Sequence, residues 1–392
     1  MEIKEVIAKK VYDSRKQETI VVYVKSEIGT FLTSSPSGKS KGKYETPAFP
    51  KSVDESIKML LGLSEKLKEI KIKEFADLIK VEAIVRKEEI GANTLYALEA
   101  SILKALAAEH KKELWEYLGG RRIPIPIGNI IGGGLHTQPT GGKRADFQEF
   151  LIIPRMKNIV DNIKIMKKAH ELVGERLKLR DSRGKLNDEN AWSTSLGNEG
   201  CLEVLNETRE EISREIDHKI EIGIDVASSS FYSGLYQYKN PERFIGDDEQ
   251  VKYIHEIINK YNLFYVEDPL SEDDFKNFKN LREIVEGKCL IVGDDLTVSK
   301  VQRLVMALKN RSISGIIVKP NQTGSLLEIK KLIEIAKKYN ISTIMSHRSG
   351  ETIDYTIADL AVGFETDFFK TGVLGDENEI KLKRLIDIEK RI

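Results

Sequence analysis

One pattern recurs through the second half of the chain: a short apolar run ends abruptly in a charged or hydrogen-bonding residue. From about residue 220 these runs end at Asp225, Glu267, Asp294, Lys319, His347 and Lys370. After Glu267 the ends lie 23 to 28 residues apart, which is the length of one strand followed by one helix. This period predicts alternating strands and helices, as in an α/β barrel, and is too long for a β-sandwich.

Two neighbouring runs, residues 316–318 and 343–345, show the repeating unit in full. The segment between them places leucine, isoleucine and alanine on one face at helical spacing and charged residues on the other. Strands rich in isoleucine and valine that are joined by a helix are typical of a parallel sheet buried on both faces. Because an α/β barrel carries its active site at the C-terminal ends of its strands, we expect Lys319, His347 and Arg348 to share one rim.

The length of 392 residues predicts two domains. We expect an N-terminal α+β domain over residues 1–122 and an α/β barrel over residues 123–392, because two prolines and a run of three glycines follow residue 122. In the first domain, residues 19–24 and 30–33 predict two strands joined by a hairpin turn. Residues 94–109 predict a helix with an apolar stripe.

Composition excludes several classes of protein. The 62 basic and 62 acidic residues cancel, so charge gives no reason to expect nucleic acid or an anionic membrane as the main partner. The two cysteines, Cys201 and Cys289, lie far apart without a CxxC spacing, which predicts neither a disulfide framework nor a zinc knuckle. No apolar signal core opens the chain, and no run of about 18 apolar residues occurs. We therefore expect a cytoplasmic protein that does not span a membrane.

Three successive runs end in carboxylates, at Asp225, Glu267 and Asp294. If their strands are neighbours, three anions converge on one mouth and repel one another unless a cation lies among them, and oxygen ligands favour Mg2+ over zinc. For each acid alone the alternative is a cap on the following helix. Lys319 and Lys370 end later runs, where a nearby cation would lower the pKa of a lysine and let it act as a base. The alternative for both is a surface lysine.

Other polar residues are weaker candidates when taken singly. Glu199 lies between two glycines in a predicted turn, and Gln148 and Glu149 precede the apolar run 150–153. His136 follows three glycines and a leucine, where a single histidine is usually an ordinary loop residue.

Arg348 and Ser349 stand where a helix is expected to begin, so that an arginine fork and free N–H groups would hold a phosphate. The chain contains no GxGxxG motif after a strand, no Walker loop, no GxSxG elbow and no HExxH. Nucleotide-binding and serine-hydrolase interpretations therefore lack support.

A series of short motifs resembles the signatures of the enolase family, in the same order from about residue 8 to residue 390. They are DSR at 13–15, PSG at 36–38, GAN at 91–93, QEF at 148–150, IDVASS at 224–229, VEDP at 266–269, GDDL at 293–296, KPNQ at 319–322, SHRSGE at 346–351 and KTG at 370–372. The resemblance implies an N-terminal capping domain and a modified (β/α)8 barrel of the TIM type. It also implies a lyase of glycolysis and gluconeogenesis that reversibly dehydrates 2-phospho-D-glycerate to phosphoenolpyruvate with Mg2+.

The same resemblance implies roles for particular residues. By motif matching, Lys319 removes the proton on C2, and Glu199 protonates the departing C3 hydroxyl with Glu149 beside it. One of two expected Mg2+ ions is held by Asp225, Glu267 and Asp294. Ser40, in a mobile lid loop, closes over the substrate and helps to bind the second ion. The residues expected to contact substrate are His136, Gln148, Ser40, Glu267, Asp294, Lys319, His347, Arg348, Ser349 and Lys370.

The chain departs from the family pattern at several positions. Asn198 stands where the family has aspartate, and Cys201 stands where it has glycine. Ser230 and Ile353 replace glutamates, and Asp387 replaces an arginine near the subunit contact. A homodimer or higher homo-oligomer is expected, with altered contact residues.

Two alternatives therefore stay open beside the enolase reaction on a small phosphorylated acid. One is an enolase-like paralogue that acts on another carboxylate substrate. The other is a non-catalytic binding protein on the same scaffold.

Overall fold

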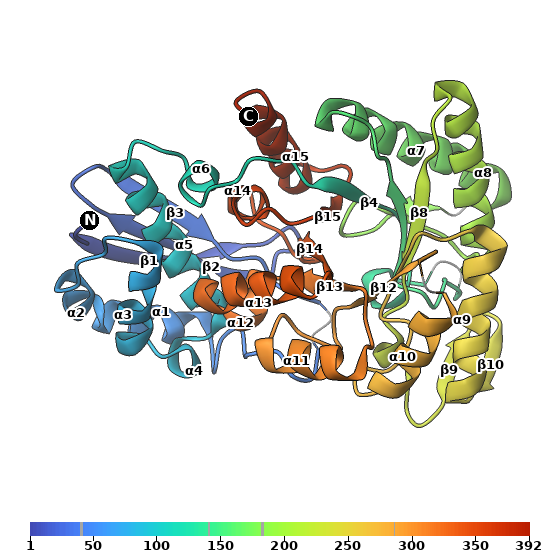
Figure 1. Ribbon diagram of the computed structural model, residues 1–392, viewed down its shortest axis with the longest axis horizontal. Coiled ribbons are helices and arrows are strands. Elements are labelled where there is room, and N and C mark those ends of the chain that lie inside the picture. Colours follow the sequence, from blue (N-terminus) through green and yellow to red (C-terminus); the bar gives the residue numbers. More distant parts are fainter. Residues whose placement is uncertain (40–41, 140–141, 182–183, 286) are drawn as a thin grey trace.

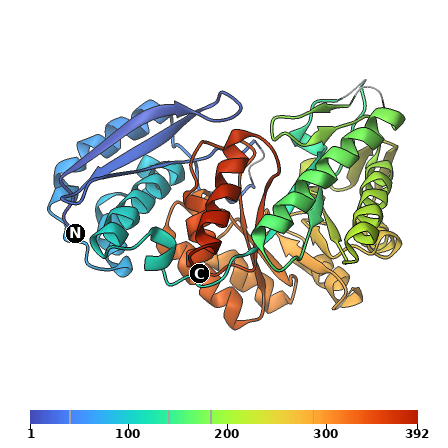
Figure 2. The ribbon, with the colours of Figure 1, turned by 90° about the horizontal axis from the view of Figure 1, so that it is seen from above.

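The computed structural model describes residues 1–39, 42–139, 142–181, 184–285 and 287–392. A small three-stranded sheet with its helices lies at one end of the molecule, and a closed barrel surrounded by helices forms the rest (Figure 1). The same two bodies lie side by side when the molecule is seen from above (Figure 2).

The N-terminal sheet is an antiparallel meander of β1 (Glu5–Tyr12), β2 (Glu18–Lys25) and β3 (Thr30–Ser34). The two predicted strands and their hairpin are thus confirmed. Helix α5 (Ala92–Glu109), also predicted, packs on β2 and β3, and the Ser101 hydroxyl donates to the Val22 carbonyl at 2.9 Å. This helix is buried on nearly all sides because its other face meets the barrel domain at α12 (Pro320–Thr323).

Shorter helices complete this part of the chain. They are α1 (Val53–Gly62), α2 (Ser64–Lys68), the 3-10 turn η1 (Phe75–Asp77), α3 (Leu78–Ile84), α4 (Lys87–Ile90) and α6 (Leu114–Tyr117). Helix α1 begins where the Ser52 side chain accepts from the Glu55 N–H at 3.1 Å, which satisfies one of the amide groups left unpaired at a helix start.

Eight strands form the barrel. In sequence order they are β4 (Ile125–Gly132), β5 (Glu149–Ile153), β8 (Glu221–Asp225), β11 (Tyr265–Glu267), β12 (Leu290–Gly293), β13 (Gly315–Val318), β14 (Ser342–Ser346) and β15 (Phe368–Gly372). The barrel closes because β15 pairs with β4. Strand β5 is antiparallel to both of its neighbours, whereas the other adjacent pairs are parallel. The predicted α/β barrel is confirmed. Its modification is the antiparallel direction of β5.

Apolar side chains fill the barrel interior. The inner cluster consists of Ile127, Leu151, Ile153, Tyr265, Val292, Ile317, Ile344 and Phe368, all buried. Such a barrel is a packed core and not a pore, so its polar side chains collect at one end. Gly223 leaves room for one of the large rings, because a Cβ there would lie 2.7 Å from the Cβ of Tyr265.

Helices cover the outside of the barrel (Figure 1). They are α7 (Ile159–Arg180), α8 (Asn198–Ile216), α9 (Asp247–Tyr261), α10 (Phe275–Ile284), α11 (Val301–Asn310), α13 (Leu326–Lys338), α14 (Thr356–Gly363) and α15 (Asp376–Glu389). The predicted crossover helix between residues 318 and 343 is α13, capped by Ser325, whose side chain accepts from the Glu328 N–H at 3.0 Å. The two-stranded elements β6 (Lys185–Leu186) with β7 (Trp192–Ser193), and β9 (Tyr236–Lys239) with β10 (Glu242–Ile245), lie in loops.

Two local predictions are wrong. Glu199 does not lie in a turn but in the first turn of α8, because the apolar residues that follow it bury one face of a continuous helix. Arg348 and Ser349 do not begin a helix, since α14 begins at Thr356. The segment they occupy instead pairs with the N-terminal domain, through the bridge between Ser37 and Gly350.

The segment after β3 crosses the mouth of the barrel. Ser37 and Gly350 exchange backbone hydrogen bonds of 2.7 and 2.9 Å, and the Lys39 N–H donates to the Ser349 hydroxyl at 2.8 Å. The carbonyl of Pro36 accepts from the amides of Asn93 and Asn321 at 2.9 and 3.1 Å. The N-terminal domain therefore closes one side of the barrel mouth.

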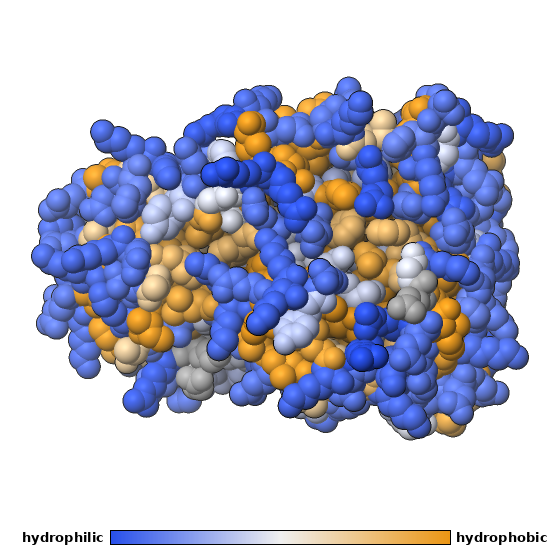
Figure 3. Space-filling model, in the orientation of Figure 1, coloured by the Kyte–Doolittle hydropathy of each residue, from blue (hydrophilic) through white to orange (hydrophobic). Residues whose placement is uncertain are grey.

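On the face shown in Figure 3, hydrophilic residues cover most of the rim and apolar residues gather in separate areas between them. None of the helices in the described ranges is both long enough and apolar enough to cross a bilayer.

Candidate active site

Three carboxylates stand at neighbouring strand ends on the barrel mouth. Asp225 ends β8, Glu267 ends β11, and Asp294 follows β12, in the strand order β8-β11-β12. Asp225 and Glu267 are register partners, so their side chains leave the sheet at the same level. All three are buried. The structure thus brings the predicted acids to one side of the mouth.

Lys370 lies at the centre of the buried charge. Its ammonium is 2.7 Å from Glu267 Oε2, 2.7 Å from Glu149 Oε2 and 3.1 Å from Asp225 Oδ2. Burial by itself would lower the pKa of Lys370, but the surrounding carboxylates, Asp225 foremost, raise it well above the ordinary value. The lysine is therefore charged and holds three acids together.

Lys319 faces Asp294 across the next pair of strands. It follows β13, its ammonium forms an ion pair with Asp294 Oδ2, and its backbone N–H donates to the Ser299 hydroxyl at 2.9 Å. Burial lowers its pKa, yet Asp294 outweighs this effect and the net shift is upward. The lowered pKa that we expected for Lys319 and Lys370 is thus not what the protein groups alone produce, because Asp294 outweighs burial at Lys319 and several carboxylates outweigh it at Lys370.

The acid side chains suit a hard divalent cation. Burial, and then the neighbouring carboxylates, raise the pKa values of Asp225 and Glu267, so additional positive charge between them would be stabilising. Glu267 Oε1 is buried and has no hydrogen-bond partner among the described residues. Only oxygen donors are present in this trio, as Mg2+ prefers. These residues fit Mg2+.

The distances between possible ligand atoms do not single out the three acids that were predicted to hold the metal. In the described part of the chain, two groups have ligand atoms within 4.8 Å of one another: Asp268 with Asp294 and Asp295, and His136 with Glu149 and Glu189. The trio of Asp225, Glu267 and Asp294 is not among them, so these three would need to draw together around an ion. Carboxylate clusters able to bind a metal are nevertheless present at the mouth.

Asp268 has a structural task that the sequence did not reveal. Its two oxygens accept from the backbone N–H groups of Asp294 at 2.9 Å and Asp295 at 2.7 Å. These bonds fix the turn that follows β12. Asp294 belongs to this turn, so the same bonds hold it at the mouth.

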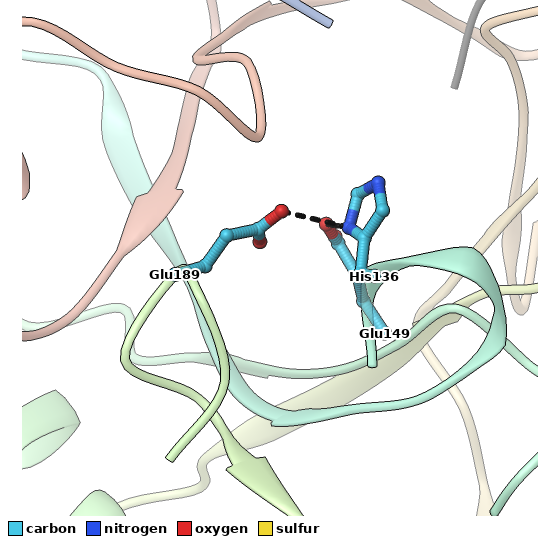
Figure 4. Close-up of side chains that lie close together, drawn as sticks. All are labelled: His136, Glu149 and Glu189. Carbon is cyan, nitrogen blue, oxygen red and sulfur yellow. Dashed lines mark ion pairs between the residues drawn. The ribbon is translucent and has the colours of Figure 1, made fainter. Parts of the chain in front are cut away.

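The second group lies on the other side of the mouth (Figure 4). His136 ends the 3-10 turn η2 (Gly134–His136) after β4, Glu149 begins β5, and Glu189 lies between β6 and β7. His136 Nδ1 is 2.8 Å from Glu189 Oε1 and 3.4 Å from Glu149 Oε1. All three residues are buried.

Charge within this group is balanced by a proton on the imidazole. Burial favours neutral His136, but Glu189 and then Glu149 outweigh it and raise the pKa of His136 to about 10. The pKa values of both carboxyls are lowered against the cost of their burial, Glu149 chiefly by Lys370 and Glu189 chiefly by His136. The sequence had pointed to His136 and Glu149 but not to Glu189, because only the fold of a distant hairpin brings that side chain here.

Glu199 does not join either group. Its carboxylate is 2.7 Å from the Lys260 ammonium on α9, and half of its side chain is exposed. The adjacent Asn198 turns inward instead, and its side-chain oxygen accepts from the N–H groups of Asp146 at 2.8 Å and Phe147 at 3.0 Å. The position matched to a catalytic glutamate therefore faces a surface ion pair.

The remaining predicted residues line the mouth near the N-terminal domain. Buried Arg348 pairs with the carboxylate of Glu45, at 3.1 and 3.2 Å from its Nη2, and His347 is held as a neutral imidazole because burial lowers its pKa. Gln148 Nε2 donates to Asp225 Oδ2 at 3.3 Å. Gly38 is needed above the arginine, since a Cβ there would lie 1.9 Å from Arg348 Nη2. Ser40 lies outside the described residues.

The fold and the mouth together define a class of protein. A closed α/β barrel carries buried acids suited to a divalent cation, the buried Lys370, the mostly buried Lys319 and a buried arginine at the C-terminal ends of its strands. Such a site is equipped to remove a proton next to a carboxylate and to stabilise the anion that results. This is the equipment of a metal-assisted lyase.

Comparisons with known proteins identify the family. Residues 3–118 match the family model described as the enolase N-terminal domain, and residues 121–392 match the enolase C-terminal TIM barrel domain. The enolase of Methanocorpusculum labreanum is 37% identical over 402 residues, which cover 99% of both chains. The enolases of Natronomonas pharaonis and Picrophilus torridus are 36% and 34% identical and cover at least 98% of either chain. The chain belongs to the enolase family.

Membership makes the chain a lyase of the phosphopyruvate hydratase type, which acts in glycolysis and depends on Mg2+. The fold expected from the resemblance is confirmed in both domains. Nothing in these comparisons favours the paralogue or the binding protein that had been left open.

Proposed function

We propose that the barrel mouth performs the reversible dehydration of 2-phospho-D-glycerate to phosphoenolpyruvate with Lys319 as the base. The observation that carries this assignment is the placement of Lys319 opposite Glu149. Lys319 follows β13 and Glu149 begins β5, and these strands lie four places apart in the closed ring of eight. A substrate between them would meet a base on one side and acidic groups on the other.

The proton on C2 is difficult to remove because its loss adds a second negative charge to the neighbouring carboxylate. The ammonium of Lys370, already surrounded by buried acids, lies where it would bind that carboxylate. Mg2+ held by Asp225, Glu267 and Asp294 would supply further positive charge to the same group when bound. Lys319 takes the C2 proton when its amine is in the neutral form.

Arg348 and Ser349 are assigned to the phosphate. A guanidinium binds a phosphate through two parallel hydrogen bonds, and Arg348 now makes such a pair with the carboxylate of Glu45, from Nη1 to Oε2 and from Nη2 to Oε1. An incoming phosphate would compete with Glu45 for the same donors. His136, Gln148 and the neutral imidazole of His347 line the remaining wall.

The lid and the second ion belong to the same proposal. The described part of the lid, up to Lys39, is bound to the mouth at Ser349. We assign Ser40 to the closure of the site and to a second Mg2+, giving two ions for each active site. Closure of this loop would exclude water from the reacting groups.

The proposal also covers the domain bounds, the compartment, the partners and the oligomeric state of the enzyme. We assign residues 1–122 to the capping domain and 123–392 to the barrel, in agreement with matched ranges of 3–118 and 121–392. We assign the protein to the cytoplasm, with a small phosphorylated acid and neither nucleic acid nor membrane as partner. A homodimer or higher homo-oligomer is expected, with Asp387 now paired to Lys390 within its own helix end.

A substrate screen tests the proposed reaction. Purified protein is incubated with Mg2+ and 2-phospho-D-glycerate, and in parallel with other phosphorylated and unphosphorylated 2-hydroxy acids. Formation of phosphoenolpyruvate that stops when a chelator removes Mg2+ is expected, with 2-phospho-D-glycerate the preferred substrate. Mg2+-dependent turnover of another acid in its place would overturn the assignment.

A further inference from the structure

A lysine stands in the buried stripe of the C-terminal helix α15. The side chain of Lys381 is only 1% exposed. The residues of this helix that are buried with it, at the spacing of one helical face, are Asn378, Leu382, Leu385 and Ile388. Because a lysine is almost never fully buried unless its charge is paired, Lys381 requires a specific partner.

That partner is Glu351, on the loop of residues 347–352 that follows β14 and is here called the rim loop. The Lys381 ammonium lies 2.9 Å from Glu351 Oε2, and it also donates to the carbonyls of Thr352 at 3.1 Å and Glu377 at 2.6 Å. An ammonium has three hydrogens, and these three acceptors can use all of them. The tip of the lysine is therefore fixed between α15 and the rim loop.

The rim loop carries Arg348 and Ser349, which the proposed function assigns to the phosphate. It has no regular secondary structure, and its residues are buried. A buried backbone N–H that finds no acceptor costs free energy, so a loop of this kind needs acceptors from outside a helix or a sheet. Side chains of the loop itself supply part of them.

Glu351 supplies the acceptor for the backbone of Arg348. Its Oε1 accepts from the Arg348 N–H at 2.9 Å, three positions earlier in the rim loop. The backbone of Glu351 is held in turn by Ser14, whose N–H donates to the Glu351 carbonyl at 2.8 Å. One oxygen of the carboxylate thus holds Arg348, and the other binds Lys381.

The ion pair of Lys381 and Glu351 is better explained by positioning than by stability. Replacement of a buried ion pair by apolar residues is often neutral or stabilising, so stability alone gives little reason for a lysine in this apolar stripe. Without the ammonium, however, the carboxylate would be an unpaired charge in a buried place and would move toward water. That movement would take the acceptor away from the Arg348 N–H.

We propose that Lys381 is a positioning residue for phosphate binding, which acts through Glu351 on the backbone of Arg348. This inference rests on the proposed function, in which Arg348 and Ser349 bind the phosphate of the substrate. A guanidinium makes its two parallel hydrogen bonds only in one orientation, so a shift of the Arg348 backbone weakens them. Lys381 acts from α15, behind the rim loop.

Two double variants that differ only at residue 351 test the chain of contacts. Lys381→Met/Glu351→Ala removes both charges and also the acceptor of the Arg348 N–H. Lys381→Met/Glu351→Gln removes the same charges but keeps an amide oxygen that can accept this bond. Lys381→Met alone leaves the carboxylate unpaired. Lys383→Met is the matched control, because Lys383 lies on the same helix with its side chain 72% exposed.

Two properties are measured for each variant. Isothermal titration calorimetry gives the Kd for inorganic phosphate, which requires no reaction, and steady-state kinetics with Mg2+ give KM and kcat for 2-phospho-D-glycerate. Lys381→Met and Lys381→Met/Glu351→Ala are expected to raise Kd and KM by about 10–100-fold, the effect of hydrogen bonds to a charged group. The value of kcat is expected to stay within about threefold, because the phosphate is bound equally in the ground state and the transition state.

Lys381→Met/Glu351→Gln and Lys383→Met are expected to keep Kd and KM near the wild-type values. A merely structural role of Lys381 would lower the folded fraction, and therefore the apparent kcat, in both double variants alike and would leave KM unchanged. The two double variants thus separate positioning from folding.

The proposal is overturned by equal Kd and KM values in the two double variants, or by wild-type values in Lys381→Met. Should Lys381→Met not fold, the double variants decide the question, since neither leaves a buried charge unpaired. Wild-type protein that does not convert 2-phospho-D-glycerate would contradict the proposed function, whereas the phosphate affinities of the same variants would still decide the role of Lys381.

Discussion

At the scale of single residues, buried ion pairs determine the charge and the contacts of the side chains at the barrel mouth. Lys370 is the clearest case, because its ammonium is the shared partner of Glu149, Asp225 and Glu267 and almost none of it reaches solvent. Removal of one partner from a buried ion pair leaves the other charges uncompensated, which costs more than the pair contributes when intact.

We predict that Lys370→Met abolishes dehydration and lowers the free energy of unfolding at pH 7 by about 3–5 kcal/mol. Urea denaturation measures the second effect, with Lys330→Met, a half-exposed lysine of α13, as the control. Equal midpoints for the two variants would show that the buried charges are compensated in another way.

At the residue scale, strand ends were the informative signal. Asp225, Glu267, Asp294, Lys319 and Lys370 all stand where apolar runs stop, and the fold gathers them because those runs are adjacent strands. Glu189 carried no such signal, since it belongs to a polar turn that follows no barrel strand. Glu199 is the opposite case, because a matching motif assigned it to the site while in the structure its carboxylate pairs with Lys260.

Among the elements, the hairpin of β6 and β7 brings Glu189 to His136 at the barrel mouth. It extends the barrel sheet beside β4, where Ile131 pairs with Trp192. The bonds from Glu189 and Ala191 to the Asn187 side chain hold its turn. The position of Glu189 thus depends on these local bonds together with the packing of Trp192 of β7 against the core.

Asn187→Ala removes the acceptor for two backbone N–H groups and is predicted to destabilise the turn by about 1–3 kcal/mol. We expect kcat for dehydration to fall more than the affinity for substrate, because Glu189 and its partner His136 are misplaced while the phosphate and carboxylate contacts remain. Steady-state kinetics measure both, and Asn310→Ala, at the exposed end of α11, is the control. Identical kcat values for the two variants would contradict a positioning role of this turn.

Regular elements were predictable where the pattern was periodic. The strands of the parallel part of the barrel, the hairpin of β2 and β3, and helices α5 and α13 follow directly from apolar spacing. The reversal of β5 was not visible, because β4 and β5 follow each other without an α-helix between them and a buried strand reads the same in either direction. The segment from 347 to 355 was mistaken for a helix start because its partner, Ser37, is distant in sequence.

For the whole molecule, the ionisation of the mouth sets a dependence of stability on pH. His136 has a pKa raised from 6.5 to about 10, so the folded state binds its proton more tightly than the unfolded state. Its stabilising contribution is complete below pH 6.5 and is lost as the pH rises toward about 10. Glu149 has a lowered pKa, and its contribution is present above its ordinary value of 4.5 and is lost in acid.

We therefore predict that the free energy of unfolding falls between pH 6.5 and about 10. Urea denaturation at a series of pH values measures it, and His136→Gln should flatten the slope in this interval. A wild-type slope that the variant reproduces would mean that other groups cause the loss.

The two-body organisation was predictable from length and from the proline and glycine cluster near residue 122. How the bodies meet was not, because the contact depends on single amides such as Asn93 and Asn321 at the Pro36 carbonyl. The balance of charge over the whole chain fits a molecule that binds its anionic substrate through a local set of cations.

The account depends most on the base, and exchange of the C2 hydrogen of 2-phospho-D-glycerate in deuterated water measures it most directly. Wild-type protein with Mg2+ is predicted to exchange this hydrogen, and Lys319→Ala is predicted to lower the rate by at least about 10²–10⁴-fold while remaining folded. Exchange by Lys319→Ala at the wild-type rate would contradict the proposed chemistry of this mouth.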